Sequence, residues 1–444
     1  MTGARNALGN GVYRRLLTAQ VVCLAGTGLA TVALGLLAFD VAGAGAGRVL
    51  GTVFAIKMVA YVLISPVAQA VVSRLPRRQV MVAADALRAA VALALPLIDQ
   101  VWQVYALVFV LQAASAVHSP TFQAAIPDVL ADVRQYTQAL SFSRLAEDLE
   151  MVLSPMLAAA LLLVIPPDAL FWGTAVGFAG SAALIGSIAI PRPRASQEGG
   201  TAFAQLPFGI RVRRGMRLMW RVRALRPVLA LNLTVAAAGA FVLVQTVVIA
   251  RDTFGQGNDV VAVLLAVNGA GSMTAALTLP KMLARLPERT VMLGGAVVMS
   301  AATLLVPLAL RVAAPAVGLA AIGALWVAVG FGWACTEVPF GRIVIREVPD
   351  ADRPAVFAAE FSLSHLCWLV TYPVAGWLGA VGLGRTALLL ALVAAASGLV
   401  GARLWRADAR ARPARRYAAG LTMRRSLPKG ATVVRPSNAK PRPR

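Results

Sequence analysis

Long apolar runs dominate the chain and alternate with short polar stretches. Each run is roughly 20 residues long, which is the length that a helix needs to cross the hydrocarbon core of a bilayer. The runs lack the period-two alternation of barrel strands, and helices satisfy their backbone hydrogen bonds internally. The pattern predicts twelve spanning helices, at residues 15–39, 49–73, 79–98, 101–125, 139–165, 168–190, 226–250, 259–284, 289–312, 315–341, 356–380 and 385–405.

The composition agrees with a lipid environment for these helices. The chain has 444 residues, of which 59% are hydrophobic and 14% are charged, and its mean hydropathy is +0.74. A soluble protein of this length needs more polar surface. The first run follows Arg14 and Arg15 and is too long for a signal-peptide core, so we interpret it as a retained helix. The sequence therefore predicts an all-α polytopic membrane protein.

Neither metal binding nor catalysis is indicated. The three cysteines, Cys23, Cys335 and Cys367, fall within apolar runs, which favours small packing residues over a disulfide framework or a zinc site. No metal-ligand or nucleophile constellation is evident, so we expect no cofactor and no enzyme activity. The chain contains no G-x-x-x-x-G-K-[ST] loop, so an ATP-driven pump would need a separate subunit.

Basic residues gather on alternate loops and in the segment between the sixth and seventh runs. The opposite loops are short and carry few basic residues. Because cytoplasmic loops of membrane proteins carry the Lys/Arg excess, both termini are expected in the cytoplasm, which requires an even number of spans. The net charge of +23 lies between spans and in the tail, so we expect no binding of nucleic acid.

The two halves of the chain resemble each other. The loop residues 74–81 match residues 285–292 at an offset of 285 − 74 = 211, and Pro96 and Pro307 share this offset. Further along, Pro120 matches Pro339 at an offset of 339 − 120 = 219. Such a parallel repeat is one transporter architecture, with the substrate site expected near the midplane between the halves.

The sequence motifs of the chain resemble those of the major facilitator superfamily. Residues 73–78 resemble the signature of that family's first cytoplasmic loop, although Ser73 replaces its Asp and Gln69 stands where Gly is usual. Asp85 and Arg88 resemble an Asp-x-x-Arg pattern of the branch that contains enterobactin-type exporters, as do residues 118–120 and 126–129. The resemblance implies two six-helix pseudo-symmetric bundles that transport a small molecule by alternating access.

Polar residues within the spans are candidates for the transport pathway. A charge at the bilayer centre costs about 2.5 to 3.5 kcal/mol on an insertion scale, so such residues usually face a cavity or a partner. Glu337 and His118 occupy equivalent places, since 337 − 118 = 219. The resemblance puts the helices that carry them beside the central cavity. We expect Glu337 to bind and release a proton and His118 to contact substrate or share that proton; the alternative is a structural hydrogen bond.

A second pair of candidates is Lys57 in the second run and His365 in the eleventh. In the fold that the resemblance implies, these two helices face each other across the interface between the halves. We therefore expect Lys57 and His365 to line the pathway or its gate. A snorkelling lysine and a packed histidine are the alternative.

Charged residues near the cytoplasmic ends of helices form two further groups. The resemblance implies that a charge latch there takes part in cytoplasmic gating, with the residues Arg74, Arg77, Arg78, Asp85 and Arg88. The alternative is that basic residues of this loop only fix the topology.

Arg144 has helical spacing to Glu147 and Asp148 at the expected start of the fifth helix, and we interpret these three as a surface ion-pair cluster. Glu360, at the matching start of the eleventh helix, is interpreted in the same way.

The predicted organisation is a cytoplasmic N-terminus (1–14), an N-terminal bundle (15–190), a basic connector (191–225), a C-terminal bundle (226–405) and a basic tail (406–444). The tail lacks residues to bury a core, so we expect it to be disordered and to contact anionic lipids. Residues 211–223 of the connector are expected to form an amphipathic helix on the membrane.

The predicted function is secondary active transport, as proton-coupled efflux of a small organic molecule such as a drug, siderophore or secondary metabolite. We expect an antiporter that is a monomer in the bacterial cytoplasmic membrane. Import of a small metabolite, or a non-transporting sensor or scaffold with the same fold, remain alternatives.

Overall fold

The computed structural model describes residues 6–42, 46–72, 75–191, 208–379 and 382–425. Within these residues the chain is helical, with short connections between long helices. The helices are α1 (Gly11–Ala42), α2 (Ala46–Val72), α3 (Arg77–Ala94), α4 (Val101–Val129), α5 (Val133–Leu162), α6 (Ala169–Gly186), α9 (Phe208–Arg221), α10 (Arg226–Val248), α11 (Asn258–Arg285), α12 (Glu288–Ala309), α13 (Pro315–Glu337), α14 (Phe340–Glu347), α15 (Arg353–Gly379) and α16 (Leu383–Arg425).

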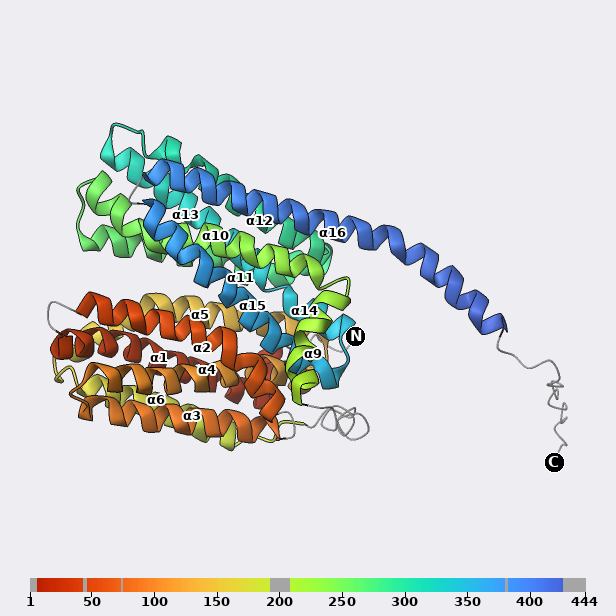
Figure 1. Cartoon of the computed structure of the whole chain (residues 1–444), viewed down its shortest axis with the longest axis horizontal. Helices are drawn as coiled ribbons and strands as arrows, with labels where there is room; N and C mark the ends of the chain where they lie inside the picture. Colours follow the sequence, from red (N-terminus) through yellow and green to blue (C-terminus); the bar gives the residue numbers. More distant parts are fainter. Residues whose placement is uncertain (1–5, 43–45, 73–74, 192–207, 380–381, 426–444) are drawn as a thin grey trace, which may run out of the picture.

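The long helices form two bundles (Figure 1). The first, called the N-half here, contains α1 to α6, and the second, the C-half, contains α10 to α16. α9 and α14 lie at one end of the assembly, near the N-terminus, and this end is called the connector side (Figure 1). The predicted fold class, with two bundles of six long helices each, is confirmed.

Eleven helical segments of the described chain are long and apolar enough to cross a membrane. The remaining long helix is α5, whose first eighteen residues contain five charged side chains, from Arg134 to Glu150. Charged residues in spanning helices usually face the bundle interior or a water-filled cavity. The charged face of α5 is therefore expected to point away from lipid, toward the C-half.

Small residues let neighbouring helices approach closely, which is how packing replaces the hydrophobic effect within lipid. Gly26 of α1 and Gly177 of α6 face each other so closely that a Cβ on Gly177 would lie 2.8 Å from the Cα of Gly26. In the C-half, a Cβ on Gly330 would overlap the carbonyl oxygen of Asn268 in α11. These approaches fix α1 against α6 and α11 against α13.

The internal repeat of the sequence has a structural counterpart on the connector side. Arg77 at the start of α3 forms an ion pair with Asp128 near the end of α4. The equivalent of Arg77 is Glu288, since 77 + 211 = 288, and Glu288 at the start of α12 lies 3.0 Å from Nη1 of Arg346 and 3.1 Å from Nε of Arg342. Each half thus joins the start of its third helix to the end of its fourth or to the short helix that follows it, with the charges reversed between the halves.

The connector forms a helix where residues 211–223 were expected to, and α9 packs against both halves at α2 and α15. Gly215 lies against the backbone of Ala355, and Nε of Arg214 is 2.5 Å from Oδ1 of Asp352. Met219 on the same helix is fully buried. α9 therefore spans the two halves on the connector side, beyond its expected role as a surface helix.

The tail was expected to be disordered, and this expectation stays a prediction. α16 continues through residue 405 to Arg425 and projects beyond the bundles (Figure 1). Alanine and arginine, which are strong helix formers, make up most of residues 407–419, whereas Pro413 within this stretch disfavours a helix. Residues 426–444 lie outside the described residues, and lipid contact by the tail stays a prediction.

Candidate functional site: a cavity between the two halves

A cavity of about 410 Å³ lies between the N-half and the C-half. Its volume is within the range of small-molecule sites. The ionisable residues other than tyrosine and cysteine that line it are Arg88, His118, Arg144, Glu147, Glu337, Glu360 and His365. Aromatic rings complete much of the wall, from Tyr61, Phe122, Phe340, Phe357 and Phe361. The cavity therefore combines charged groups from both halves with an aromatic surface.

An ion pair connects the two halves across this cavity. Nη1 of Arg144 in α5 lies 2.9 Å from Oε2 of Glu337 at the end of α13. Nε of Arg144 donates a hydrogen bond to Oγ of Ser272 in α11 at 2.9 Å and lies 3.1 Å from Oδ1 of Asp148. The guanidinium also lies over the Trp333 ring, 5.1 Å from its centroid. Arg144 thus holds α5 to α11 and α13 through one side chain.

The interpretation of Arg144, Glu147 and Asp148 as a surface cluster is wrong. α5 begins at Val133, eleven residues before Arg144, so that Arg144 lies about 16 Å along the helix at 1.5 Å per residue. The side chains of Arg144 and Asp148 are 11% and 2% exposed. Glu360 also differs from its expected surface position, because it lines the cavity and lies 3.5 Å from Nδ2 of Asn232.

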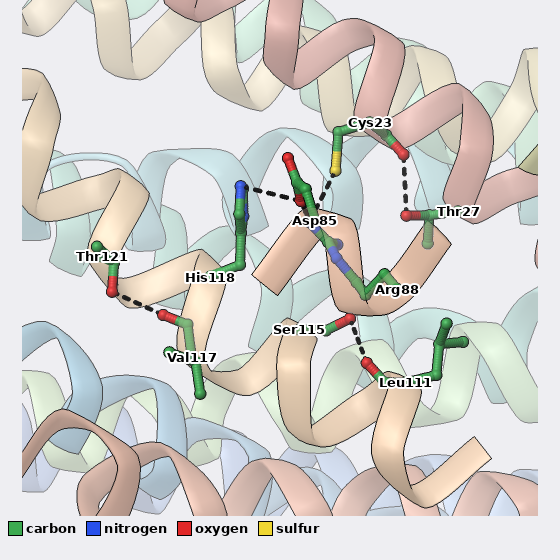
Figure 2. Close-up of polar contacts among 9 residues, drawn as sticks. All are labelled: Cys23, Thr27, Asp85, Arg88, Leu111, Ser115, Val117, His118 and Thr121. Carbon is green, nitrogen blue, oxygen red and sulfur yellow. Dashed lines mark hydrogen bonds and ion pairs between the residues drawn. The ribbon is translucent and has the colours of Figure 1, made fainter. Parts of the chain in front are cut away.

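Asp85, Arg88 and His118 form a buried polar group within the N-half (Figure 2). Arg88 is paired with Asp85 one helical turn away on α3, and its guanidinium lies 3.3 Å from Sγ of Cys23 in α1. Nε2 of His118 in α4 lies 3.5 Å from Oδ1 of Asp85 in a geometry that leaves Nε2 without a hydrogen-bond partner. The ring of His118 stacks on Phe122, with 6.0 Å between centroids.

The five residues expected to form one gating latch lie in separate places. Arg77 pairs with Asp128, and Arg78 donates a hydrogen bond to the carbonyl oxygen of Gly186. Asp85 and Arg88 are eight and eleven residues into α3, where Arg88 lines the cavity and Asp85 pairs with it. Arg74 lies outside the described residues. Only Arg77 and Arg78 are therefore placed at the connector side.

Of the pair Lys57 and His365, His365 lines the cavity, whereas Lys57 is not among its lining residues. Tyr61 lies between them. Its ring is 5.7 Å from Nζ of Lys57 and packs edge-on against the His365 ring at 4.7 Å. Nδ1 of His365 is 2.6 Å from the carbonyl oxygen of Phe361. The two helices meet as expected, with the tyrosine as the direct neighbour of both residues.

Further hydrogen bonds between the halves lie toward the connector side. Oγ of Ser65 in α2 donates to the carbonyl oxygen of Ala358 in α15 at 3.1 Å, and Oγ of Ser362 donates to that of Val62 at 2.5 Å. Both bonds join the second part of α2 to the first part of α15. Together with the pair of Arg144 and Glu337 at the cavity wall, these bonds hold the two halves together.

Sequence reasoning identified Glu337, His118 and His365 as cavity residues but missed Arg144, Glu147 and Glu360. An available signal was the density of charge in residues 144–150, within a stretch that must span the membrane. Because a charge in lipid is costly, these side chains had to face a cavity or a partner.

Comparison with known proteins identifies this architecture. Residues 16–309 match the family model described as Major Facilitator Superfamily. The chain belongs to this superfamily. An uncharacterized transporter of the same type, YfiS of Bacillus subtilis (strain 168), is 24% identical over 222 residues, which are 49% of this chain and 52% of that protein. The matched stretch thus spans about half the length of that relative.

Solved structures of transporters share the fold of this major facilitator protein. The human organic anion transporter MFSD10 (TETRAN) matches with a TM-score of 0.69 at 15% identity, over 88% of this chain and 98% of that one. FucP in its outward conformation matches with a TM-score of 0.68 at 13% identity, with the same coverage. A bacterial homologue of the iron transporter ferroportin in its outward-facing state gives 0.67 at 15% identity, again over 88% and 98%.

Proposed function

We propose that this major facilitator transporter exports a small organic molecule in exchange for protons, by alternating access of the cavity between the halves. The observation that carries the proposal is the ion pair of Arg144 and Glu337, which joins the halves at the cavity wall. A carboxylate in this position can accept a proton, and the neutral acid no longer attracts the guanidinium. Protonation of Glu337 would therefore weaken the contact that keeps the connector side closed.

The proposed cycle begins with the state described here, in which cross-half hydrogen bonds close the connector side. A proton that enters from the opposite side protonates Glu337, which releases Arg144 and lets the halves part at the connector side. The proton then leaves on that side and substrate enters the cavity. Arg144 remains paired with Asp148 on its own helix when Glu337 is neutral, so it is not left without a partner when the halves part.

The proposed orientation places the connector side in the bacterial cytoplasm, with both termini there. Its support is the positive charge of α9, which carries five arginines and no acidic residue among Phe208–Arg221. The pattern of Asp85 and Arg88 supports a place in the enterobactin-exporter-like branch and hence the direction of export. Here these two residues form a buried pair beside His118.

The test is transport by purified protein in proteoliposomes with an imposed pH gradient, using a panel of candidate substrates. We expect substrate movement against its gradient that stops when the pH gradient is collapsed. Glu337→Gln mimics the protonated acid and should abolish coupling to the gradient. Asp99→Asn removes a carboxylate that is exposed in the α3–α4 connection, outside the cavity, and serves as the matched control.

Coupled transport by Glu337→Gln at the wild-type rate would exclude the proton role of Glu337. Substrate movement in the same direction as the protons would replace export with the alternative of import. If no substrate moves although the protein is folded and inserted, the sensor or scaffold alternative is favoured.

A further inference from the structure

We propose that the substrate is a lipophilic organic cation, held between the carboxylates of Glu147 from the N-half and Glu360 from the C-half. The proposal rests on the proposed function in one respect, because it takes the cavity to be the transport site. It adds the charge and the chemical class of the substrate.

The first argument is the balance of charge at the cavity wall. Arg88 is paired with Asp85, and Arg144 is shared between Asp148 and Glu337. Neither Glu147 nor Glu360 belongs to an ion pair within 4.0 Å in the part of the chain that the structure describes. The wall therefore holds more carboxylates than cations when its groups are ionised.

Such an excess is costly in a membrane interior, where an unpaired carboxylate lacks the hydration that it has in water. It can be relieved by protons or by a cationic ligand. Lys57 does not relieve it, because its ammonium lies over Tyr61 and it is not among the lining residues. An anionic substrate would add to the excess, so the electrostatics of the cavity discriminate against it.

The second argument is the aromatic surface beside the carboxylates. Phe357, Glu360, Phe361 and Ser364 all line the cavity, from little more than two turns of α15. The ring of Tyr61 from α2 lies 4.9 Å from that of Phe361, so the aromatic surface continues onto the N-half. Faces of aromatic rings attract organic cations, and they also bury the apolar groups of such ligands.

The test compares two probes of matched shape and opposite charge, tetraphenylphosphonium and tetraphenylborate. Binding to the full-length protein is measured in detergent by isothermal titration, without any pH gradient. We expect tetraphenylphosphonium to bind at least about tenfold more tightly than tetraphenylborate. Glu147→Gln and Glu360→Gln should each weaken the binding of tetraphenylphosphonium by about tenfold or more, as truncation of a desolvated charge partner does.

The exposed Asp99→Asn change serves as the control and should leave binding of the phosphonium unchanged. Binding of tetraphenylborate as tight as that of the phosphonium would overturn the proposal. So would wild-type protein that does not bind the phosphonium, or glutamine variants that bind it like the wild type. If a variant fails to fold, the comparison of the two probes on wild-type protein decides alone.

The outcomes also separate this proposal from the proposed function. Proton-driven export of a neutral or anionic compound would remove the cation proposal and leave the proposed function intact. Selective binding of the phosphonium, without transport that responds to a pH gradient, would retain the cation site and remove proton-coupled export.

Discussion

The guanidinium of Arg144 lies 2.9 Å from the carboxylate of Glu337, and 193 residues of sequence separate the two. Each comes from a different half, so the contact exists only while the halves are close together at this depth. The pair is most sensitive to the loss of Arg144, because Glu337 and Asp148 would then both lack their cation in a partly dry site.

We expect Arg144→Gln to reduce transport by about tenfold or more, because Asp148 and Glu337 then lose their shared cation. The measurement is initial uptake or efflux in proteoliposomes at equal protein content. Arg385→Gln is the matched control, since Arg385 is exposed at the start of α16, on the side away from the connector. Equal loss in both variants would mean that the effect is general and does not come from the cross-half pair.

The ion pair of Arg77 and Asp128 gives a prediction about stability. The side chain of Asp128 is only 4% exposed, so Arg77→Ala leaves a buried carboxylate without its partner. We expect a loss of about 1 to 3 kcal/mol, measured as lower thermal stability in detergent, together with reduced transport. Arg285→Ala removes an exposed arginine on the same side and should have little effect.

A double variant of this pair tests the cause. Arg77→Ala combined with Asp128→Ala removes both charges and should recover part of the stability lost in Arg77→Ala alone. An additive result would show that the two side chains do not interact energetically. Full transport by an inserted Arg77→Ala protein would exclude a gating role for this residue.

The packing of α9 against α15 makes a steric prediction. A Cβ at Gly215 would overlap the carbonyl oxygen of Ala355, whereas a Cβ at Gly209 on the same helix would meet nothing within 4 Å. Gly215→Ala should therefore destabilise the protein by about 1 to 3 kcal/mol, as overpacking does. Gly209→Ala should be neutral or slightly stabilising, and thermal unfolding of the two variants side by side provides the measurement. Equal stability of the two would show that α9 does not dock as described.

His365 and Lys57 are expected to behave differently. His365 lines the cavity beside Phe361, so His365→Ala should weaken substrate affinity severalfold, seen as a raised KM in flux assays. Lys57→Ala removes a side chain outside the lining set and should change KM by less than about twofold, within the usual range for substitutions away from a site. The reverse order of effects would place the pathway nearer Lys57 than the structure does.

Most helices were predictable because hydropathy reports the length of apolar runs, and eleven long helices of the described chain contain such a run. The start of α5 was less accurate, at residue 139 in place of Val133. Its first turn is polar and is instead marked by Asp132, whose carboxylate accepts hydrogen bonds from the backbone N–H groups of Arg134 and Gln135. This helix cap contributes nothing to an apolar pattern, and the error of six residues moved Arg144 to the surface.

The pairing of charges could not be predicted for a different reason. Repeat symmetry related Glu337 to His118, but in the structure Glu337 contacts Arg144 and His118 contacts Asp85. Equivalent positions in a parallel repeat face the same cavity from opposite walls. Which side chain contacts the other half depends on its depth in the membrane and on the conformational state of the transporter. The spacing of residues in the sequence determines neither.

The reversed ion pairs of the connector side also bear on how the chain is made. Arg77 and Asp128 both belong to the first four helices, so their contact can form while the ribosome is still synthesising the C-half. Glu288 finds Arg342 and Arg346 later, within its own bundle. Each bundle can thus form its own ion pairs as it enters the membrane. The pair of Arg144 and Glu337 can form only when the two bundles dock.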